Sequence, residues 1–188
     1  MAREPFRATI FGSALLLSAC SSPNRLVPLS IGKKWDYNFR WGMEQETGTL
    51  EVVREIPVAD GTGWELRSPM GVLRLGYAGE NLVADQLADS FFEPSLPIGV
   101  PAGGKAAWRG WVTSHAGRKP AKAVISGELT KDKVAGRLQT VSQTTVILNT
   151  EGDTTTLTTS YAPGDGIVGQ EQVSGGKVAL SVKRVSGG

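Results

Sequence analysis

The chain has 188 residues, and its composition limits the classes of protein to which it can belong. Lysine and arginine number 20 against 18 aspartates and glutamates, and no basic block stands out, so electrostatic binding to nucleic acid has no support. A single cysteine excludes an internal disulfide, and 24 glycines disfavour long helices.

The first twenty residues have the parts of a secretory signal. Arg3 and Arg7 precede an uncharged, mostly apolar run of about a dozen residues, and small side chains follow it. The run is too short to cross a bilayer core as a helix, which takes roughly 20 residues. We therefore expect the chain to be exported and cleaved between Ala19 and Cys20.

The segment Leu17-Ser18-Ala19-Cys20 resembles a lipobox, the cleavage and lipidation motif of bacterial lipoproteins. The resemblance implies a diacylglycerol on Cys20, often with a further acyl chain such as palmitate. Two or more chains anchor a protein durably, at about 0.8 kcal/mol per buried CH₂. An ordinary signal peptide with a chance cysteine is the alternative. In a Gram-negative cell Ser21, where aspartate commonly retains a lipoprotein at the inner membrane, favours the outer membrane, facing the periplasm or the surface.

The domain organisation follows from this anchor. Residues 1–19 are predicted as the signal peptide, 20–27 as a lipidated tether, 28–185 as one β-rich domain and 186–188 as a frayed end. The mature chain has the size of one ordinary domain.

Segment 33–41 gives the clearest strand signal. Trp35, Tyr37, Phe39 and Trp41 alternate with polar residues, so in a strand the four aromatic side chains line one face. A protein core explains such a row, and a cavity for an acyl chain is the alternative.

The rest of the chain is also predicted as strands, with one short helix over 80–92, where Leu82, Val83, Leu87 and Phe91 have roughly helical spacings. Glycine-bearing turns separate several strands. The absence of βαβ alternation predicts an all-β, mainly antiparallel fold of about ten strands, as a curved sheet, half-barrel or sandwich. The further predicted strands are 47–58, 64–67, 72–77, 106–113, 121–129, 134–141, 145–150, 154–161, 167–173 and 177–185.

Three landmarks, residues 32–37, residues 96–99 followed by Trp108, and residues 161–168, resemble those of uncharacterised β-rich envelope lipoproteins. In that group the last landmark reads Tyr-Ala-Pro-Gly-apolar-Gly-x-Val and a basic residue follows. Here Asp165 replaces the apolar residue and Gly169 the basic one. The resemblance implies a curved antiparallel sheet, similar to the half-barrels of lipoprotein carriers, and no enzymatic activity.

No group of residues predicts catalysis. His115 is the only histidine, and no G-x-S-x-G elbow is present. No cysteine or histidine cluster could hold a metal, and residues 151–153 lack the ligands of a calcium loop. Paired carboxylates could come from several acids, but nothing singles out two of them. No enzyme activity, cofactor or metal site is therefore predicted. The acids considered are Glu44, Glu46, Asp60, Glu65 and Asp89.

Trp108 and Trp111 lie three apart on a predicted strand, so one should face the core and the other solvent. An exposed tryptophan could stack on a sugar or a partner, and a half-buried edge position explains it equally well.

Three functions follow in order of preference. The first is a non-catalytic envelope lipoprotein, anchored through Cys20, that binds or stabilises another envelope protein. The second is a carrier or sensor of a lipid or other lipophilic ligand in a concave apolar sheet. The third is a cell-wall hydrolase with two carboxylates.

Overall fold

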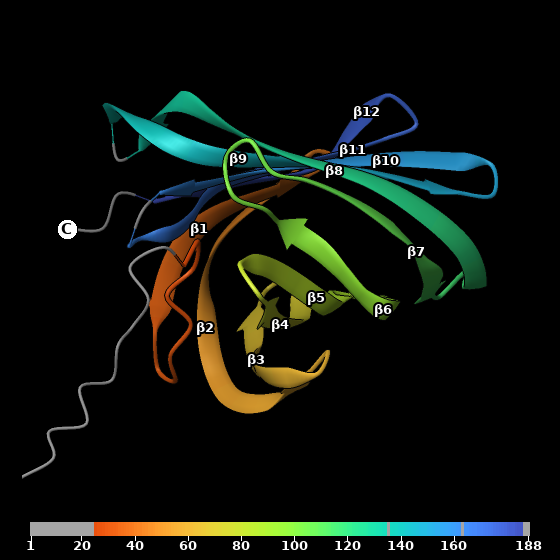
Figure 1. Cartoon of the computed structure of the whole chain (residues 1–188). Helices are drawn as coiled ribbons and strands as arrows, with labels where there is room; N and C mark the ends of the chain where they lie inside the picture. The colour runs from red at the N-terminus through yellow and green to blue at the C-terminus, as the bar shows by residue number, and fades with distance from the viewer. Residues whose placement is uncertain (1–24, 135, 163, 186–188) are drawn as a thin grey trace, which may run out of the picture.

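The computed structural model describes residues 25–134, 136–162 and 164–185, which form a closed antiparallel barrel of twelve strands (Figure 1). Each strand pairs with the next along the chain, and β1 pairs with β12 to close the barrel. In this part of the chain no helix occurs, hence none that could span a membrane. The strands are β1 Lys34–Trp41, β2 Glu44–Val58, β3 Gly61–Ser68, β4 Gly71–Ala78, β5 Asn81–Leu87, β6 Ser90–Gly99, β7 Lys105–Ser114, β8 Gly117–Val134, β9 Arg137–Thr150, β10 Asp153–Ala162, β11 Gly166–Ser174 and β12 Lys177–Arg184.

The all-β, antiparallel prediction is confirmed, but the sheet closes on itself and has more strands than the ten expected. Pairing of β1 with β12 leaves neither terminal strand as a free edge, which an open half-barrel would have had. The pairing of β6 with β7 is short, with residues 91–93 paired to residues 111–113. The seam between β1 and β12 is short, with residues 37–40 paired to residues 181–184.

The predicted helix over residues 80–92 is wrong. These residues form β5, a turn and the start of β6. Leu82, Val83 and Ala84 are all buried, and the register of β5 against β6 shifts between Leu82 and Val83. A bulge of this kind breaks the two-residue alternation of a strand. Apolar residues consequently appeared at spacings that imitate a helix.

The predicted strand 134–141 is also wrong, because a hairpin turn lies inside it. Val134 ends β8 and pairs with Arg137, which begins β9. Gly136 has φ of +79°, a conformation that glycine adopts at little cost. The break expected after residue 129 does not occur, and β8 runs through it.

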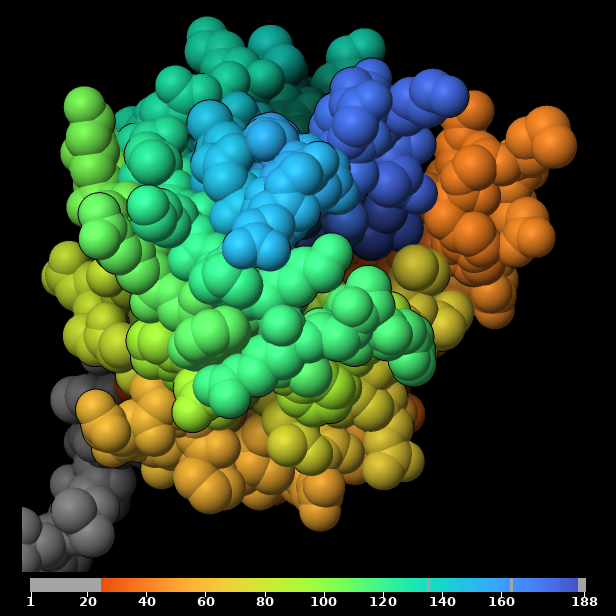
Figure 2. All heavy atoms as spheres, turned by 90° about the vertical axis from the view of Figure 1, so that its right-hand side faces the viewer, coloured from red at the N-terminus to blue at the C-terminus, as the bar shows by residue number. Residues whose placement is uncertain are grey.

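The two ends of the barrel differ. The up-and-down order places the β1–β2, β3–β4, β5–β6, β7–β8, β9–β10 and β11–β12 turns at one end, which we call the open end. Figure 2 faces this end, with the β9–β10 turn in light blue and the β11–β12 turn in darker blue. At the opposite, closed end, residues 25–33 enter the barrel. Val27 and Leu29 are buried there, and the Tyr77 hydroxyl donates to the Val27 carbonyl at 3.0 Å.

The three sequence landmarks contact one another in the barrel. Trp35 donates from Nε1 to the Asp165 carbonyl at 2.8 Å, and the Tyr37 hydroxyl donates to the Ile167 carbonyl at 2.7 Å. Tyr161 donates to the Ile98 carbonyl at 2.8 Å. The landmarks therefore fix strands that are far apart in the sequence, which gives them a structural role.

Candidate functional site: a cavity inside the barrel

The barrel encloses a cavity of about 350 Å³ that reaches toward the open end. A barrel of this size has more interior than side chains need to fill, and some barrels hold a small ligand in the remaining space. One wall comes from β9 to β12 and β1, and the other from the β3–β4 and β5–β6 hairpins with β6. The site therefore combines strands from both halves of the chain.

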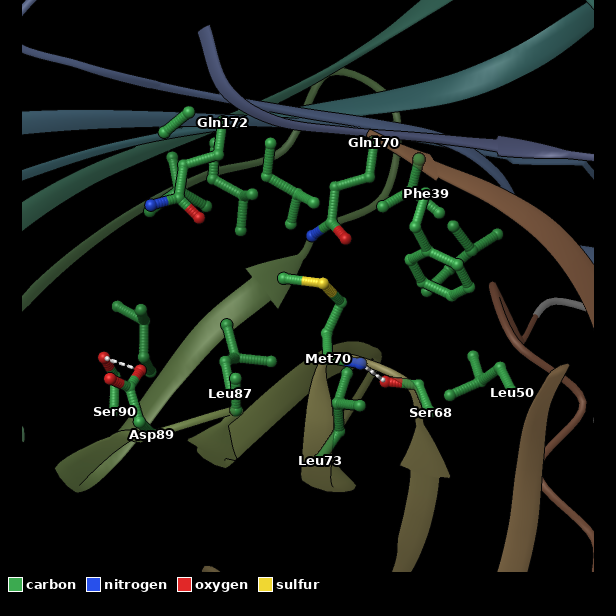
Figure 3. Close-up of a pocket in the computed structure, with 18 of the residues that line it drawn as sticks. Phe39, Leu50, Ser68, Met70, Leu73, Leu87, Asp89, Ser90, Gln170 and Gln172 are labelled. Carbon is green, nitrogen blue, oxygen red and sulfur yellow. Dashed lines mark hydrogen bonds between the residues drawn. The ribbon is translucent and has the colours of Figure 1, made fainter. Parts of the chain in front are cut away.

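The walls are mainly apolar, and Figure 3 shows their arrangement. Met70 comes from the β3–β4 turn and extends across the cavity toward β11. Leu73 and Leu87 lie on the same side, while Phe39 and Leu50 lie at one flank. Side chains of this type offer a ligand dispersion contacts and a dry surface.

Two glutamines of β11 interrupt the apolar wall. Strand register places Gln172 between Leu157 and Leu180, and Gln170 faces Val182 on β12. Those three apolar neighbours also line the cavity. Since residues two apart on a strand share a face, both carboxamides point inward, as Figure 3 shows.

The other polar groups of the wall largely bond within the protein. The Tyr37 hydroxyl is bonded to the Ile167 carbonyl, and burial raises the pKa of this phenol far above its usual value. Ser68 accepts from the Met70 amide and donates to the Gly71 carbonyl, both at 3.2 Å. Figure 3 draws no hydrogen bond from either glutamine to another residue of the wall.

Asp89, in the β5–β6 turn, is the only residue of the cavity lining with a charged side chain. Its side chain is 57% exposed, and one carboxylate oxygen lies 3.8 Å from Nε2 of His115, which is itself 91% exposed. His115 is thus a solvated turn residue. An exposed pair of this kind contributes little to stability.

The predicted aromatic row is largely confirmed as an inward face. Trp35, Tyr37 and Phe39 are buried, and Tyr37 and Phe39 line the cavity. Trp35 belongs to the core at the closed end. Trp41 is only half-buried, and its Nε1 donates to a Glu44 carboxylate oxygen at 2.6 Å beside the β1–β2 turn.

Trp108 and Trp111 face opposite ways, as their spacing predicts. Trp108 is buried and donates to the Pro94 carbonyl at 3.0 Å. Trp111 is 42% exposed, and the Arg118 guanidinium lies 4.7 Å from its ring centroid while bonding Glu93 at 2.7 Å. A cation–π contact therefore occupies Trp111.

Among the acids considered for hydrolysis, Glu65 is held by arginines. It is buried on the outer side of β3, and it accepts a bond from Arg54 at 2.6 Å with Arg67 and Arg74 at 3.6 and 4.0 Å. The Arg54 hydrogen bond lowers the pKa of this carboxyl and keeps it ionised. Glu65 thus acts as a structural charge.

Several predictions lie outside this geometry. Ala19 and Cys20 fall outside the described residues, so cleavage and lipidation remain predictions from the sequence. Within the described ranges no cluster of three or more metal-ligating residues occurs.

Sequence reasoning missed Met70, Gln170 and Gln172. The alternation of Gln170 and Gln172 with Glu171 was visible, but only the register against Leu180 and Val182 shows that the glutamines face inward. Met70 lies in a turn, where periodicity gives no signal.

No protein-family model and no curated protein matches the sequence. Among solved structures, a candidate lipoprotein of Parabacteroides distasonis is similar with a TM-score of 0.49 and 10% identity, over 85% of this chain and 96% of that one. A candidate exported protein of Bacteroides fragilis with a YmcC-like fold has a TM-score of 0.45 and 11% identity, over 84% of this chain and 96% of that one. The hypothetical lipoprotein YmcC of Escherichia coli has a TM-score of 0.45 and 10% identity, over 88% of this chain and 87% of that one.

Proposed function

We propose that the protein is a lipid-anchored envelope lipoprotein whose barrel binds a small lipophilic molecule without catalysis. The observation that carries this proposal is the apolar cavity of about 350 Å³. Small-molecule sites typically enclose about 300–1,000 Å³ and combine mostly apolar walls with a few polar groups. Apolar ligand surface removed from water there contributes roughly 25 cal/mol per Å².

The proposed localisation rests on the sequence. Export followed by lipidation is favoured by Arg3 and Arg7, the short apolar run and the Cys20 motif. In a Gram-negative cell the lipoprotein would then be delivered to the outer membrane. Mass analysis of the native protein tests this: a diacylated Cys20 at the mature N-terminus is expected. An uncleaved leader or an unmodified thiol contradicts it.

The chemistry of the cavity supports binding without catalysis. Hydrolysis of a glycosidic bond by the two-carboxylate route needs a pair of acids about 5–10 Å apart. The cavity lining has one carboxylate, Asp89, and the buried acid Glu65 is engaged by arginines on the outer side of the barrel.

Binding to another envelope protein is the second candidate, and one surface favours it. Val124 and Ile147 are direct cross-strand partners on β8 and β9, and they are 61% and 40% exposed. This exposed apolar pair offers a partner protein a small apolar contact on the outer face of the barrel.

A displacement assay tests the proposed cavity. The neutral fluorophore N-phenyl-1-naphthylamine should bind the purified barrel and be displaced by single-chain lipids. Leu180→Trp places an indole in the cavity and should weaken binding about tenfold or more, because it occupies ligand volume. Leu138→Trp is the matched control, since Leu138 is 64% exposed on β9.

Unchanged affinity in Leu180→Trp, with folding confirmed by circular dichroism, contradicts the cavity as the binding site. Leu73→Trp, from the opposite wall, provides a second variant should the first fold poorly.

A further inference from the structure

We propose that the cavity selects an uncharged single-chain amphiphile, whose polar head bonds Gln170 and Gln172 and whose tail lies deeper among apolar side chains. This inference rests on the proposed function and names the class of ligand that the same cavity takes. A monoacylglycerol has the required chemistry, with one apolar chain and hydroxyl and ester groups that donate and accept hydrogen bonds.

The first step is the position of the two carboxamides. Gln170 and Gln172 are half-buried, and they occupy inward positions whose neighbours in register on β12, Val182 and Leu180, are apolar. A carboxamide needs up to four hydrogen bonds, two donated and two accepted. Placing such a group against an apolar wall is unfavourable unless water or a ligand satisfies it.

The second step is the direction of the cavity. Gln172 lies two residues before the end of β11 at the open end, together with Asp89 and Ser90 of the β5–β6 turn. Leu96 and Ile167 lie toward the closed end. The polar groups are therefore near the mouth and the apolar groups deeper, so a ligand enters tail first.

The third step is charge. No lysine or arginine lines the cavity, and Asp89 at the mouth is its only charged side chain. A fatty-acid carboxylate would meet this carboxylate without a cationic partner, which disfavours its binding. An uncharged head avoids that repulsion and still uses both glutamines. Asp89 is 57% exposed, so screening weakens both its repulsion of a carboxylate and its attraction for an ammonium head. Either charged head would also lose water without a buried group of opposite charge in the lining, which disfavours both relative to an uncharged head.

The experiment compares three ligands with the same twelve-carbon chain: monolauroylglycerol, laurate and dodecylammonium. Each displaces N-phenyl-1-naphthylamine from the folded barrel at pH 7.5, below the critical micelle concentration. The monoacylglycerol should bind about tenfold more tightly than laurate and more tightly than dodecylammonium.

Two variants test the residues. Gln170→Leu/Gln172→Leu should lower the affinity for monolauroylglycerol about tenfold, because each hydrogen bond lost accounts for a few-fold, while the neutral fluorophore still binds. Gln139→Leu, at an exposed position on β9, is the matched control and should change nothing. Asp89→Lys should raise the affinity for laurate several-fold, because it places a cation at the mouth.

The outcomes separate the two proposals. Laurate or dodecylammonium binding most tightly, or a double variant with unchanged affinity for monolauroylglycerol, overturns the uncharged-head inference and leaves the cavity as a lipophilic site. Failure of the fluorophore and all three amphiphiles to bind the folded barrel overturns the proposed function, and this inference with it.

Discussion

All three tyrosines of the described chain tie distant segments together through their hydroxyl groups. Tyr37 bonds the Ile167 carbonyl, Tyr77 bonds Val27, and Tyr161 bonds the Ile98 carbonyl. Each ring thereby buries apolar surface and satisfies its polar end. Burial raises the pKa of all three phenols. A single residue type thus supplies both core volume and long-range connection.

These raised pKa values predict loss of stability at alkaline pH. The unfolded chain releases phenol protons near pH 10.0, whereas the folded protein retains them, so the free energy of unfolding falls as pH rises above that value. Tyr161→Phe should reduce stability by about 1–3 kcal/mol at pH 7, because the Ile98 carbonyl loses its donor. The alkaline decline should become shallower, because one titrating group is gone.

Urea unfolding followed by tryptophan fluorescence between pH 7 and 11 measures both effects. An equally steep decline in Tyr161→Phe would show that this phenol does not drive the pH dependence.

At the scale of the strand, sequence reasoning was reliable where alternation was regular and failed where it was not. Residues 34–41 alternate strictly between polar and aromatic side chains, and the aromatic face is the one that points into the barrel. In β5 a bulge interrupts the alternation of inward-facing and outward-facing residues. The register against β6 shifts between Leu82 and Val83, and the resulting spacing of apolar residues suggested a helix. Register is set by pairing with neighbouring strands, which a single sequence does not contain.

The β2–β3 turn offers a test of local backbone strain. Ala59 has φ of +50°, a left-handed conformation that costs a residue with a Cβ roughly 1–2 kcal/mol. Ala59→Gly should therefore raise the free energy of unfolding by about 0.5–1 kcal/mol, after allowing for the greater freedom of glycine in the unfolded chain.

Ala107→Gly is the matched control, because Ala107 is exposed in the middle of β7. This substitution should lower the free energy of unfolding by about 0.5–1 kcal/mol. Chemical denaturation of both variants compares the signs. A destabilised Ala59→Gly would refute strain at this turn.

For the whole molecule, the sequence predicted the class of fold but neither closure nor the site. Closure depends on β1 meeting β12, which are more than 130 residues apart, through the pairs that join Tyr37 to Arg184 and Arg40 to Ser181. The cavity arises from what the closed wall leaves unfilled. The aromatic strand was predicted mainly as core, and only Tyr37 and Phe39 of its row also line the cavity. Gln170 and Gln172 could be recognised only once their register was known.

Closure through a short seam predicts uneven protection of backbone amides. The β1–β12 seam pairs residues 37–40 with 181–184, whereas β8 and β9 are paired along residues 121–134 and 137–150. Amides at the seam should exchange with solvent at least tenfold faster than those in the middle of β8 and β9, because opening there breaks fewer bonds. Hydrogen–deuterium exchange with mass spectrometry measures the difference, and equal protection would contradict it.

The sealed floor formed by Val27 and Leu29 lies where residues 25–33 enter the barrel, so a lipid on Cys20 would set the orientation of the barrel at the membrane. If Cys20 carries lipid, the five residues to Arg25 reach at most about 18 Å, at roughly 3.5 Å per residue. The bilayer is then held beside the sealed floor, and the mouth with Gln172 and Asp89 faces the aqueous side. A ligand would then be exchanged with a partner molecule that approaches from the aqueous side. The membrane leaflet that holds the anchor would have no direct route into the barrel.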